Sequence, residues 1–287
     1  MQSRPSLKKI EINNTTLHYI EAGEEHAQSV VFVHGGLGDY RTWNPQIASF
    51  AEHYHVISYS RRAFYPNPWP PDYRAAMSQH IDDLSELIVK LDLAPAYLVA
   101  NSYGGYVCLK VALKHPELVS AMALAEPPVQ PLLATLPGGG EMLEEVRVRA
   151  WVASGEAFTH GDLEEGVRLF LDGAVGQGTF DEMQPRVRDA MMKNAPEMSA
   201  ATLAEYYYFM PDFTCEDARK IVQPTLLMRG ANSPKMYYLI NDELARCIPK
   251  TEQALIPDAA HVLNSHNPEA HNRVVLDFLA RYTLHPE

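Results

Sequence analysis

The sequence predicts an α/β protein in which helices cover both faces of a mostly parallel central sheet. Two observations predict this class. Short apolar segments rich in β-branched residues alternate with segments of helical period near both ends of the chain, and short links join them. Between these two stretches, residues 127–215 show helical patterns and no clear strand. We therefore expect one sheet, with a helical lid inserted between its sixth and seventh strands.

The first part of the sheet is predicted within residues 1–126. Residues 8–12 and 16–21 are expected to form two short strands around Asn13-Asn14, a hairpin-like turn. Periodic apolar positions and β-branched runs predict the other elements of this part. They are the strands 29–33, 55–59, 96–100 and 119–125 and the helices 42–50, 78–91 and 103–114.

Residues 127–215 are predicted to form the lid, and residues 216–287 to complete the sheet. Aromatic residues are frequent in the lid, including Trp151, Phe170 and the run Tyr206–Phe209, and we expect some of them to line an apolar pocket. The expected elements are the lid helices 141–155, 162–171, 185–194 and 199–209, then strand 224–229, helix 239–247, strand 252–256 and helix 268–282.

The chain has 287 residues and a formal net charge of −12. The phosphates of nucleic acids and anionic membrane surfaces repel an acidic chain, so we expect neither as a partner. No apolar run is long enough to span a bilayer, and the polar start of the chain lacks the apolar core of a signal peptide. We expect a cytoplasmic protein that binds a small-molecule substrate, and a homo-oligomer remains open.

Three cysteines, Cys108, Cys215 and Cys247, are widely spaced and odd in number. We therefore expect reduced thiols, as in a cytosolic protein. No group of cysteines and histidines has metal-ligand spacing, and no Gly-x-Gly-x-x-Gly sequence follows a strand. The sequence thus predicts neither a metal nor a cofactor.

The segment Leu98–Val107 carries the strongest indication of chemistry. An apolar run reaches Ser102, then two glycines follow after Tyr103, and then a helix-like segment. A serine on a sharp strand-to-helix turn projects its hydroxyl into solvent, and small residues must flank it because the two backbones come close. This segment resembles the nucleophile elbow of the α/β-hydrolase family, Gly-x-Ser-x-Gly, with Ala100 at the first glycine position and Gly104 at the second. The plain alternative is a Ser-Gly loop before a helix.

The glycine-rich segment His34–Gly38 follows another predicted strand. Glycines there let backbone N–H groups point into the crevice at the strand ends, and acyl transfer needs two such donors for the developing oxyanion. In α/β-hydrolases the residue after His-Gly and the residue after the nucleophile supply them, so the resemblance implies Gly36 and Tyr103. A phosphate-binding loop is the alternative, but no Gly-Lys-Ser/Thr follows. Arg61 and Arg62, after the next strand, are expected to hold a loop rather than to bind substrate.

His261 is the candidate general base. It closes the segment 256–261 directly after the last predicted strand, and this segment resembles the histidine loop of the same family, commonly Pro-x-x-Gly/Ala-His. Of the twelve histidines, it alone follows the last strand with small neighbours. A histidine that only packs against the core is the alternative.

The acid of the triad departs from the family pattern. Many members carry an Asp three residues after a Gly that ends the penultimate strand, but this chain has Ser233 at that place. An imidazole still needs an anion that fixes its tautomer and stabilises its cation. We expect Glu126, at the end of the strand that precedes the lid, because some family members place the acid there. Asp258 is the rival on the loop of His261, and Asn232 could orient the imidazole but could not offset its charge.

The resemblance implies a carboxylic ester hydrolase with the triad Ser102, His261 and Glu126. Ser102 would attack a carbonyl and His261 would act as base and then as acid. The N–H groups of Gly36 and Tyr103 would hold the oxyanion, and water would release the acyl group. The apolar lid and the acidic chain favour small, mostly uncharged esters or lactones. A cofactor-free lyase or oxygenase and a non-catalytic small-ligand receptor are the alternatives on the same fold.

Overall fold

The central sheet has eight strands in the computed structural model, which describes residues 5–25, 27–204 and 209–282. Their order across the sheet is β1-β2-β4-β3-β5-β6-β7-β8. The strands are β1 (Leu7–Ile12), β2 (Thr15–Ala22), β3 (Ser29–Val33), β4 (His55–Tyr59), β5 (Ala96–Asn101), β6 (Val119–Ala125), β7 (Thr225–Gly230) and β8 (Thr251–Ile256). β1 and β4 each pair with β2 in the antiparallel sense, and the pairs from β4 through to β8 are parallel. The mostly parallel sheet predicted from the sequence is therefore confirmed.

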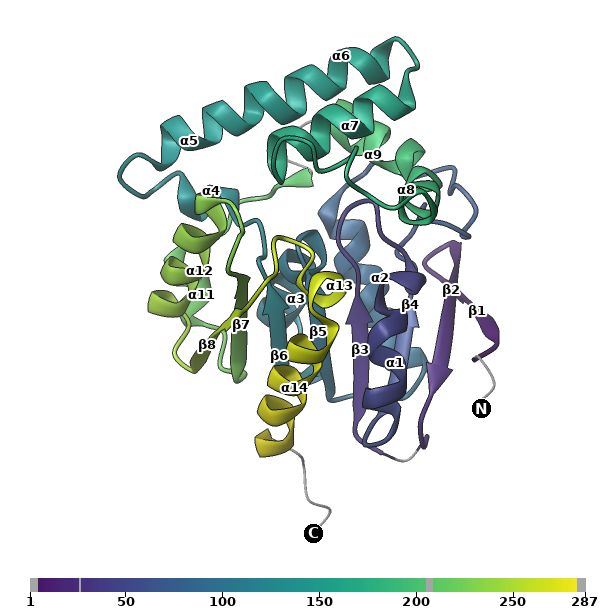
Figure 1. Cartoon of the computed structure of the whole chain (residues 1–287). Helices are drawn as coiled ribbons and strands as arrows, with labels where there is room; N and C mark the ends of the chain where they lie inside the picture. The colour runs from purple at the N-terminus through teal and green to yellow at the C-terminus, as the bar shows by residue number, and fades with distance from the viewer. Residues whose placement is uncertain (1–4, 26, 205–208, 283–287) are drawn as a thin grey trace.

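Helices cover both faces of the sheet, and strand residues alternate between two apolar cores. In β3, which is buried along its whole length, Val31 and Val33 belong to one core and Val30 and Phe32 to the other. The first core includes residues of α2 (Met77–Lys90), α3 (Tyr103–Lys114) and α12 (Lys235–Cys247), and the second includes residues of α1 (Asn44–Ala51) and α14 (Pro268–Leu279). Figure 1 shows α1 and α14 on the face of the sheet turned to the viewer. Short helical turns complete the chain: Tyr40–Trp43, Pro116–Leu118, α11 (Cys215–Arg219), α13 (Leu263–His266) and Ala280–Tyr282.

Between β6 and β7 the described chain contains helices and no strand. We call residues 127–215 the helical insert, a boundary that stays a prediction. Among its described residues the helices are α4 (Gln130–Leu133), α5 (Gly139–Val146), a π-helical stretch (Arg147–Val152), α6 (Ala153–Thr159), α7 (Leu163–Ala174), α8 (Pro185–Met192) and α9 (Ala195–Leu203). Figure 1 shows α5 to α9, in teal and green, lying across one end of the sheet. The chain enters the insert from the end of β6, so the loops after the parallel strands lie beneath these helices.

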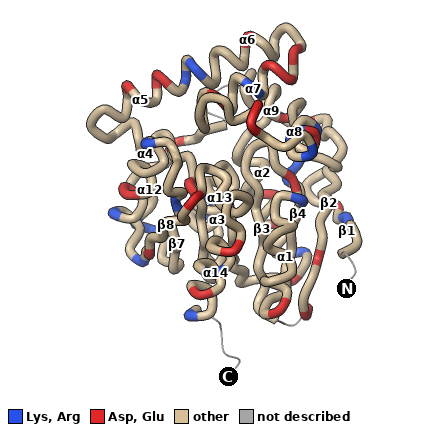
Figure 2. The backbone as a smooth tube through the Cα atoms, in the orientation of Figure 1, with Lys and Arg blue, Asp and Glu red and all other residues tan. Residues whose placement is uncertain are grey.

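Charged residues lie mostly on the outer helices and loops, and both signs occur on the insert and on the rest of the molecule (Figure 2). The strands of the sheet carry mainly apolar residues, as their burial requires. Within the described ranges, no helix combines the length and the apolar character needed to cross a membrane.

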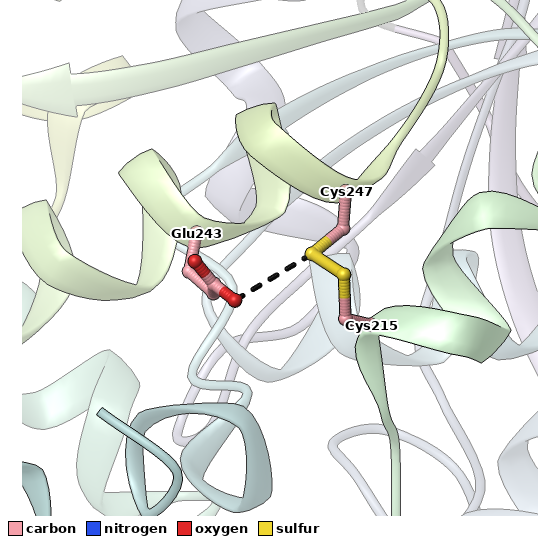
Figure 3. A group of neighbouring side chains, drawn as sticks. All are labelled: Cys215, Glu243 and Cys247. Carbon is pink, nitrogen blue, oxygen red and sulfur yellow. Dashed lines mark hydrogen bonds between the residues drawn. A yellow bond between two sulfur atoms is a disulfide. The ribbon is translucent and has the colours of Figure 1, made fainter.

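Cys215 and Cys247 form a disulfide, so the expectation of three reduced thiols is wrong. Their Cα atoms lie 5.3 Å apart although 32 positions separate them, because α11 packs against α12. Figure 3 shows the bond beside Glu243 of α12. Cys215, Glu243 and Cys247 lie close enough together to bind a metal ion, but a metal binds the thiolate form of cysteine. While the disulfide persists, this group therefore offers no thiolate ligand. The third cysteine, Cys108, is a free thiol in the core, and burial raises its pKa.

Candidate active site

Ser102 lies on a sharp turn between β5 and α3. Its φ of 50° and ψ of −129° place its backbone outside the regions that most side chains adopt. The turn is tight because α3 passes close to β3: a Cβ atom at Gly104 would lie 2.4 Å from the Val33 carbonyl oxygen. The glycine at this position is thus required by the close approach of two backbones, as the elbow pattern predicted.

His261 extends from the loop after β8 toward this serine. Its Nε2 atom lies 2.9 Å from the Ser102 Oγ atom, a hydrogen-bond distance. The imidazole stacks on the ring of Tyr237, with centroids 4.1 Å apart and planes inclined by 20°. Tyr237 belongs to α12, and burial, then the nearby Glu126 carboxylate, hold the pKa of this tyrosine well above its usual range. The phenol is therefore a neutral surface that supports the imidazole.

Glu126 follows β6 directly and is fully buried. Its Oε2 atom lies 2.7 Å from His261 Nδ1, and its Oε1 atom accepts the Gly230 N–H at 2.8 Å. In the sheet, Asn101 of β5 pairs with Ala125 of β6, so Ser102 and Glu126 leave neighbouring strands at the same level. The fold therefore brings the hydroxyl, the imidazole and the carboxylate together in one hydrogen-bonded series.

The rival acidic and polar groups lie elsewhere. The Asp258 side chain is exposed, and its backbone has a φ of 54°. Asn232 is exposed as well, and its backbone N–H donates to the Ala259 carbonyl at 2.8 Å. Ser233, at the usual place of the acid, is partly buried, and its Oγ atom has no hydrogen-bond partner among the described residues. Glu126 is thus the carboxylate that faces His261 in the described chain.

The two expected oxyanion donors border one cavity together with Ser102 and His261. Gly36 follows β3 and is exposed, and its N–H makes no hydrogen bond within the described ranges. Tyr103 is the first residue of α3, where backbone N–H groups have no partner inside the helix. These backbone groups are therefore available to a negatively charged oxygen beside Ser102.

The cavity has a volume of about 620 Å³, within the range of small-molecule sites. About half of the residues that line it belong to the helical insert, and most of those are apolar or aromatic. The wall includes Leu37, Trp151, Phe170, Met198, Phe209 and Met210. Of the aromatic run expected to line it, Tyr206–Tyr208 lies outside the described residues, whereas Phe209 stacks on Tyr103 with centroids 4.4 Å apart.

Some residues of the site could not be found from the sequence. The stack of Tyr237 on His261 depends on how α12 packs, and no motif marks this tyrosine. Asn101 accepts the Gly35 N–H at 2.9 Å and so joins the glycine-rich loop to the strand of Ser102. A short polar residue directly before the nucleophile was the available signal, but its partner lies 66 positions away.

A serine hydroxyl, an imidazole and a buried carboxylate in series, beside backbone N–H donors, define the class of site found in serine hydrolases. The family model of the alpha/beta hydrolase fold matches residues 28–268. The chain therefore belongs to the α/β-hydrolase family, which confirms both the predicted fold and, at the level of the family, the expected class of enzyme.

Similar proteins carry hydrolase names. The (E)-2-((N-methylformamido)methylene)succinate hydrolase of Acinetobacter baylyi is 26% identical over 271 residues, which cover 93% of this chain and 95% of that protein. Among solved structures, the enol-lactonase from Burkholderia xenovorans LB400 matches with a TM-score of 0.76 and 21% identity, over 95% of this chain and 100% of that one. The carboxylesterase CesB from Bacillus subtilis matches with a TM-score of 0.74 and 18% identity, over 98% and 93%. At these identities the two structural matches establish the fold alone.

Proposed function

We propose that the protein is a serine hydrolase that cleaves small, mostly uncharged carboxylic esters or lactones through an acyl-enzyme. The observation that carries the proposal is the hydrogen-bonded series from Ser102 through His261 to Glu126, whose serine and histidine line an apolar cavity. Nucleophile, base and orienting acid within hydrogen-bond reach are the signature of nucleophilic catalysis.

In the proposed reaction, Ser102 Oγ attacks the carbonyl carbon while its proton passes to His261 Nε2. The imidazolium that forms keeps its Nδ1–H on the Glu126 carboxylate, which offsets the new positive charge. The carbonyl oxygen, now an oxyanion, accepts from the N–H groups of Gly36 and Tyr103. His261 then protonates the leaving alcohol, and a water molecule repeats these steps on the acyl-enzyme to release the acid.

The residues that line the cavity favour substrates that carry no charge. Two arginines line it, Arg41 and Arg186. Arg41 is already paired with Asp39 through two hydrogen bonds, of 2.8 and 2.5 Å, and Arg186 is an exposed residue whose Nε donates to Gln184. A carboxylate substrate would therefore find no buried unpaired cation among these groups. The lactonase and carboxylesterase names of the two structural neighbours agree with ester or lactone substrates.

A fluorophosphonate and short p-nitrophenyl esters test the proposal. The reagent should add to Ser102, as mapped by peptide mass spectrometry, and Ser102→Ala should lose nearly all ester turnover while its circular dichroism stays that of the parent. Ser265→Ala is the matched control, because this serine also lines the cavity but lies outside the hydrogen-bonded series. A Ser102→Ala protein with the parental rate on every accepted ester would show that the nucleophile is misassigned.

The same experiment separates the alternatives. A cofactor-free lyase or oxygenase would use His261 to remove a substrate proton and would form no acyl-enzyme. A receptor would bind the ester without turning it over.

The cytoplasmic location and the homo-oligomer stay predictions. The expectation of this location rests in part on reduced cysteines, and the disulfide between Cys215 and Cys247 removes that argument.

A further inference from the structure

The carbonyl oxygen of Gly35 accepts hydrogen bonds from two side chains that the proposed reaction does not use. Arg61 Nη2 lies 3.0 Å from this oxygen and His34 Nδ1 lies 2.8 Å from it. Both side chains are buried, with 1% of Arg61 and none of His34 exposed. Because a carbonyl oxygen can only accept, both nitrogens donate to it.

The bond from His34 is fixed by the neutral form of its ring. The backbone N–H of Arg61 donates to His34 Nε2 at 2.9 Å, so the ring proton stays on Nδ1, facing Gly35. Burial, and then the charge of Arg61, lower the pKa of His34 well below its usual range. A protonated ring would set a second N–H against the N–H of Arg61. His34 is therefore a constant donor to the Gly35 carbonyl.

The preceding peptide group is held as well. Arg61 Nε donates to the His34 carbonyl oxygen at 3.2 Å, and the Gly35 N–H donates to Asn101 Oδ1 at 2.9 Å. Gly35 also packs against the nucleophile, since a Cβ atom at its position would lie 2.9 Å from the Ser102 Cβ. The glycine-rich loop thus has a fixed position relative to Ser102, and Arg61 supplies two of the bonds that fix it.

We propose that Arg61 and His34 are positioning residues that aim the Gly36 N–H at the oxyanion, an inference that rests on the proposed serine hydrolase function. In a trans peptide the C=O and N–H groups point in opposite directions, so holding the Gly35 oxygen sets the direction of the Gly36 N–H. The Arg61 charge also polarises this peptide group, which makes its N–H a stronger donor. Arg61 does not line the cavity, so it acts through the peptide and not on the substrate.

Arg61→Lys tests this role, with Arg62→Lys as its control. An ammonium keeps the charge but lacks the planar fork that reaches the His34 and Gly35 carbonyls together. Losing one oxyanion donor costs about 100- to 1000-fold in kcat, and we expect a misaimed donor to cost about 10- to 100-fold, with KM within about threefold of the parent. Arg62 is equally buried but bonds Asp83 through two contacts of 2.6 Å, so Arg62→Lys should lower thermal stability and leave kcat unchanged.

Two substitutions of His34 form an independent pair if Arg61→Lys does not fold. The amide nitrogen of Asn can take the place of Nδ1, and an amide group of Gln the place of Nε2. His34→Asn should therefore retain the donor to Gly35 and most of kcat, whereas His34→Gln should lose about as much kcat as Arg61→Lys. Equal kcat values for His34→Asn and His34→Gln would overturn the role of His34.

Binding of a trifluoromethyl ketone separates positioning from a merely structural role. This ketone adds reversibly to a catalytic serine and forms an oxyanion, whereas the matching methyl ketone binds as a ground-state analogue. We expect Arg61→Lys to weaken the binding of the trifluoromethyl ketone by the same factor as it lowers kcat. The binding of the methyl ketone should weaken by less than about threefold. Equal losses for both ketones, or a parental kcat, would overturn the inference while the proposed function stands. A parent protein that neither hydrolyses esters nor binds the trifluoromethyl ketone would overturn both.

Discussion

The Oε2 atom of Glu126 lies 2.7 Å from the Nδ1 atom of His261, across 135 positions of the chain. The second carboxylate oxygen accepts the Gly230 N–H at 2.8 Å. The carboxylate is thus held at the junction of three strand ends: it follows β6, its N–H partner ends β7, and its imidazole partner follows β8. With a partner on each oxygen, this buried group has a defined orientation toward the imidazole.

Glu126→Gln should lower kcat by about two to four orders of magnitude, as the loss of the orienting acid does in serine proteases, and should leave KM nearly unchanged. The Gly230 N–H and His261 Nδ1 bond different oxygens of Glu126, so a carboxamide places its NH₂ group against one of these two donors. This NH₂ group cannot accept a hydrogen bond, and the neutral amide cannot offset the charge of an imidazolium. Steady-state kinetics on p-nitrophenyl acetate measure the effect. A parental kcat would contradict the role of Glu126 and leave those of Ser102 and His261 standing.

Ser233→Asp in the Glu126→Gln background should restore part of the activity, by at least about tenfold. Ser233 stands where many family members carry the acid, near the end of β7, and its Oγ atom is buried without a partner in the described structure. An aspartate there can approach His261 from the neighbouring strand end. The control is Asn232→Asp in the same background, because this side chain is exposed and should restore nothing. Equal recovery by the two aspartates would mean that added negative charge alone is responsible.

The fold could be predicted because its signals are local. The pattern of apolar residues within a segment such as β3 or α2 already indicates which of its side chains are buried. The residues of the segment itself are therefore enough to predict a strand or a helix. Element ends were predicted less accurately: the helix expected over 239–247 begins at Lys235, directly after Pro234. The elbow and histidine motifs marked Ser102 and His261 for the same local reason.

Contacts between distant segments that no motif marks could not be predicted. The disulfide forms because α11 packs against α12, and the spacing of Cys215 and Cys247 in the sequence does not predict this contact. The bonds from Arg61 to the Gly35 carbonyl depend on the parallel pairing of β3 with β4, which places the loops after these strands side by side. Such contacts follow from packing, and a single sequence records packing only indirectly.

Reduction of the disulfide should destabilise the protein. A bond that closes a loop across 32 positions restricts the unfolded chain and contributes about 4 kcal/mol in the loop-entropy model. We expect a lower Tm in the presence of a strong reductant and in the Cys215→Ser, Cys247→Ser double variant, as measured by scanning calorimetry. The double variant is also the control for the reductant, which should not change its Tm further. An unchanged Tm of the parent after verified reduction would contradict the stabilising role.

We expect the free energy of unfolding to depend on pH through Glu197. This carboxyl lies on α9 of the helical insert, is only 2% exposed, and accepts a hydrogen bond from the Tyr73 hydroxyl of the loop between β4 and α2. Burial raises the pKa of Glu197 from 4.5 to about 7, although the Arg61 charge and the Tyr73 bond act in the opposite direction. The pKa of Tyr73 is also well above its usual range, so the phenol stays neutral while the carboxyl titrates.

The sign of the effect follows from proton counting. Between pH 4.5 and about 7 the folded protein retains the Glu197 proton that the unfolded chain has lost, so the free energy of unfolding falls as the pH rises through this window. Glu197→Gln keeps an oxygen for the Tyr73 hydroxyl and removes the titration. Relative to the parent, this variant should gain stability between pH 5 and pH 8, by at most about 3 kcal/mol. Urea unfolding at the two pH values measures the gain, and each protein serves as its own reference at pH 5. Parallel stability profiles of Glu197→Gln and the parent would show that this carboxyl is ionised in the folded protein throughout the window.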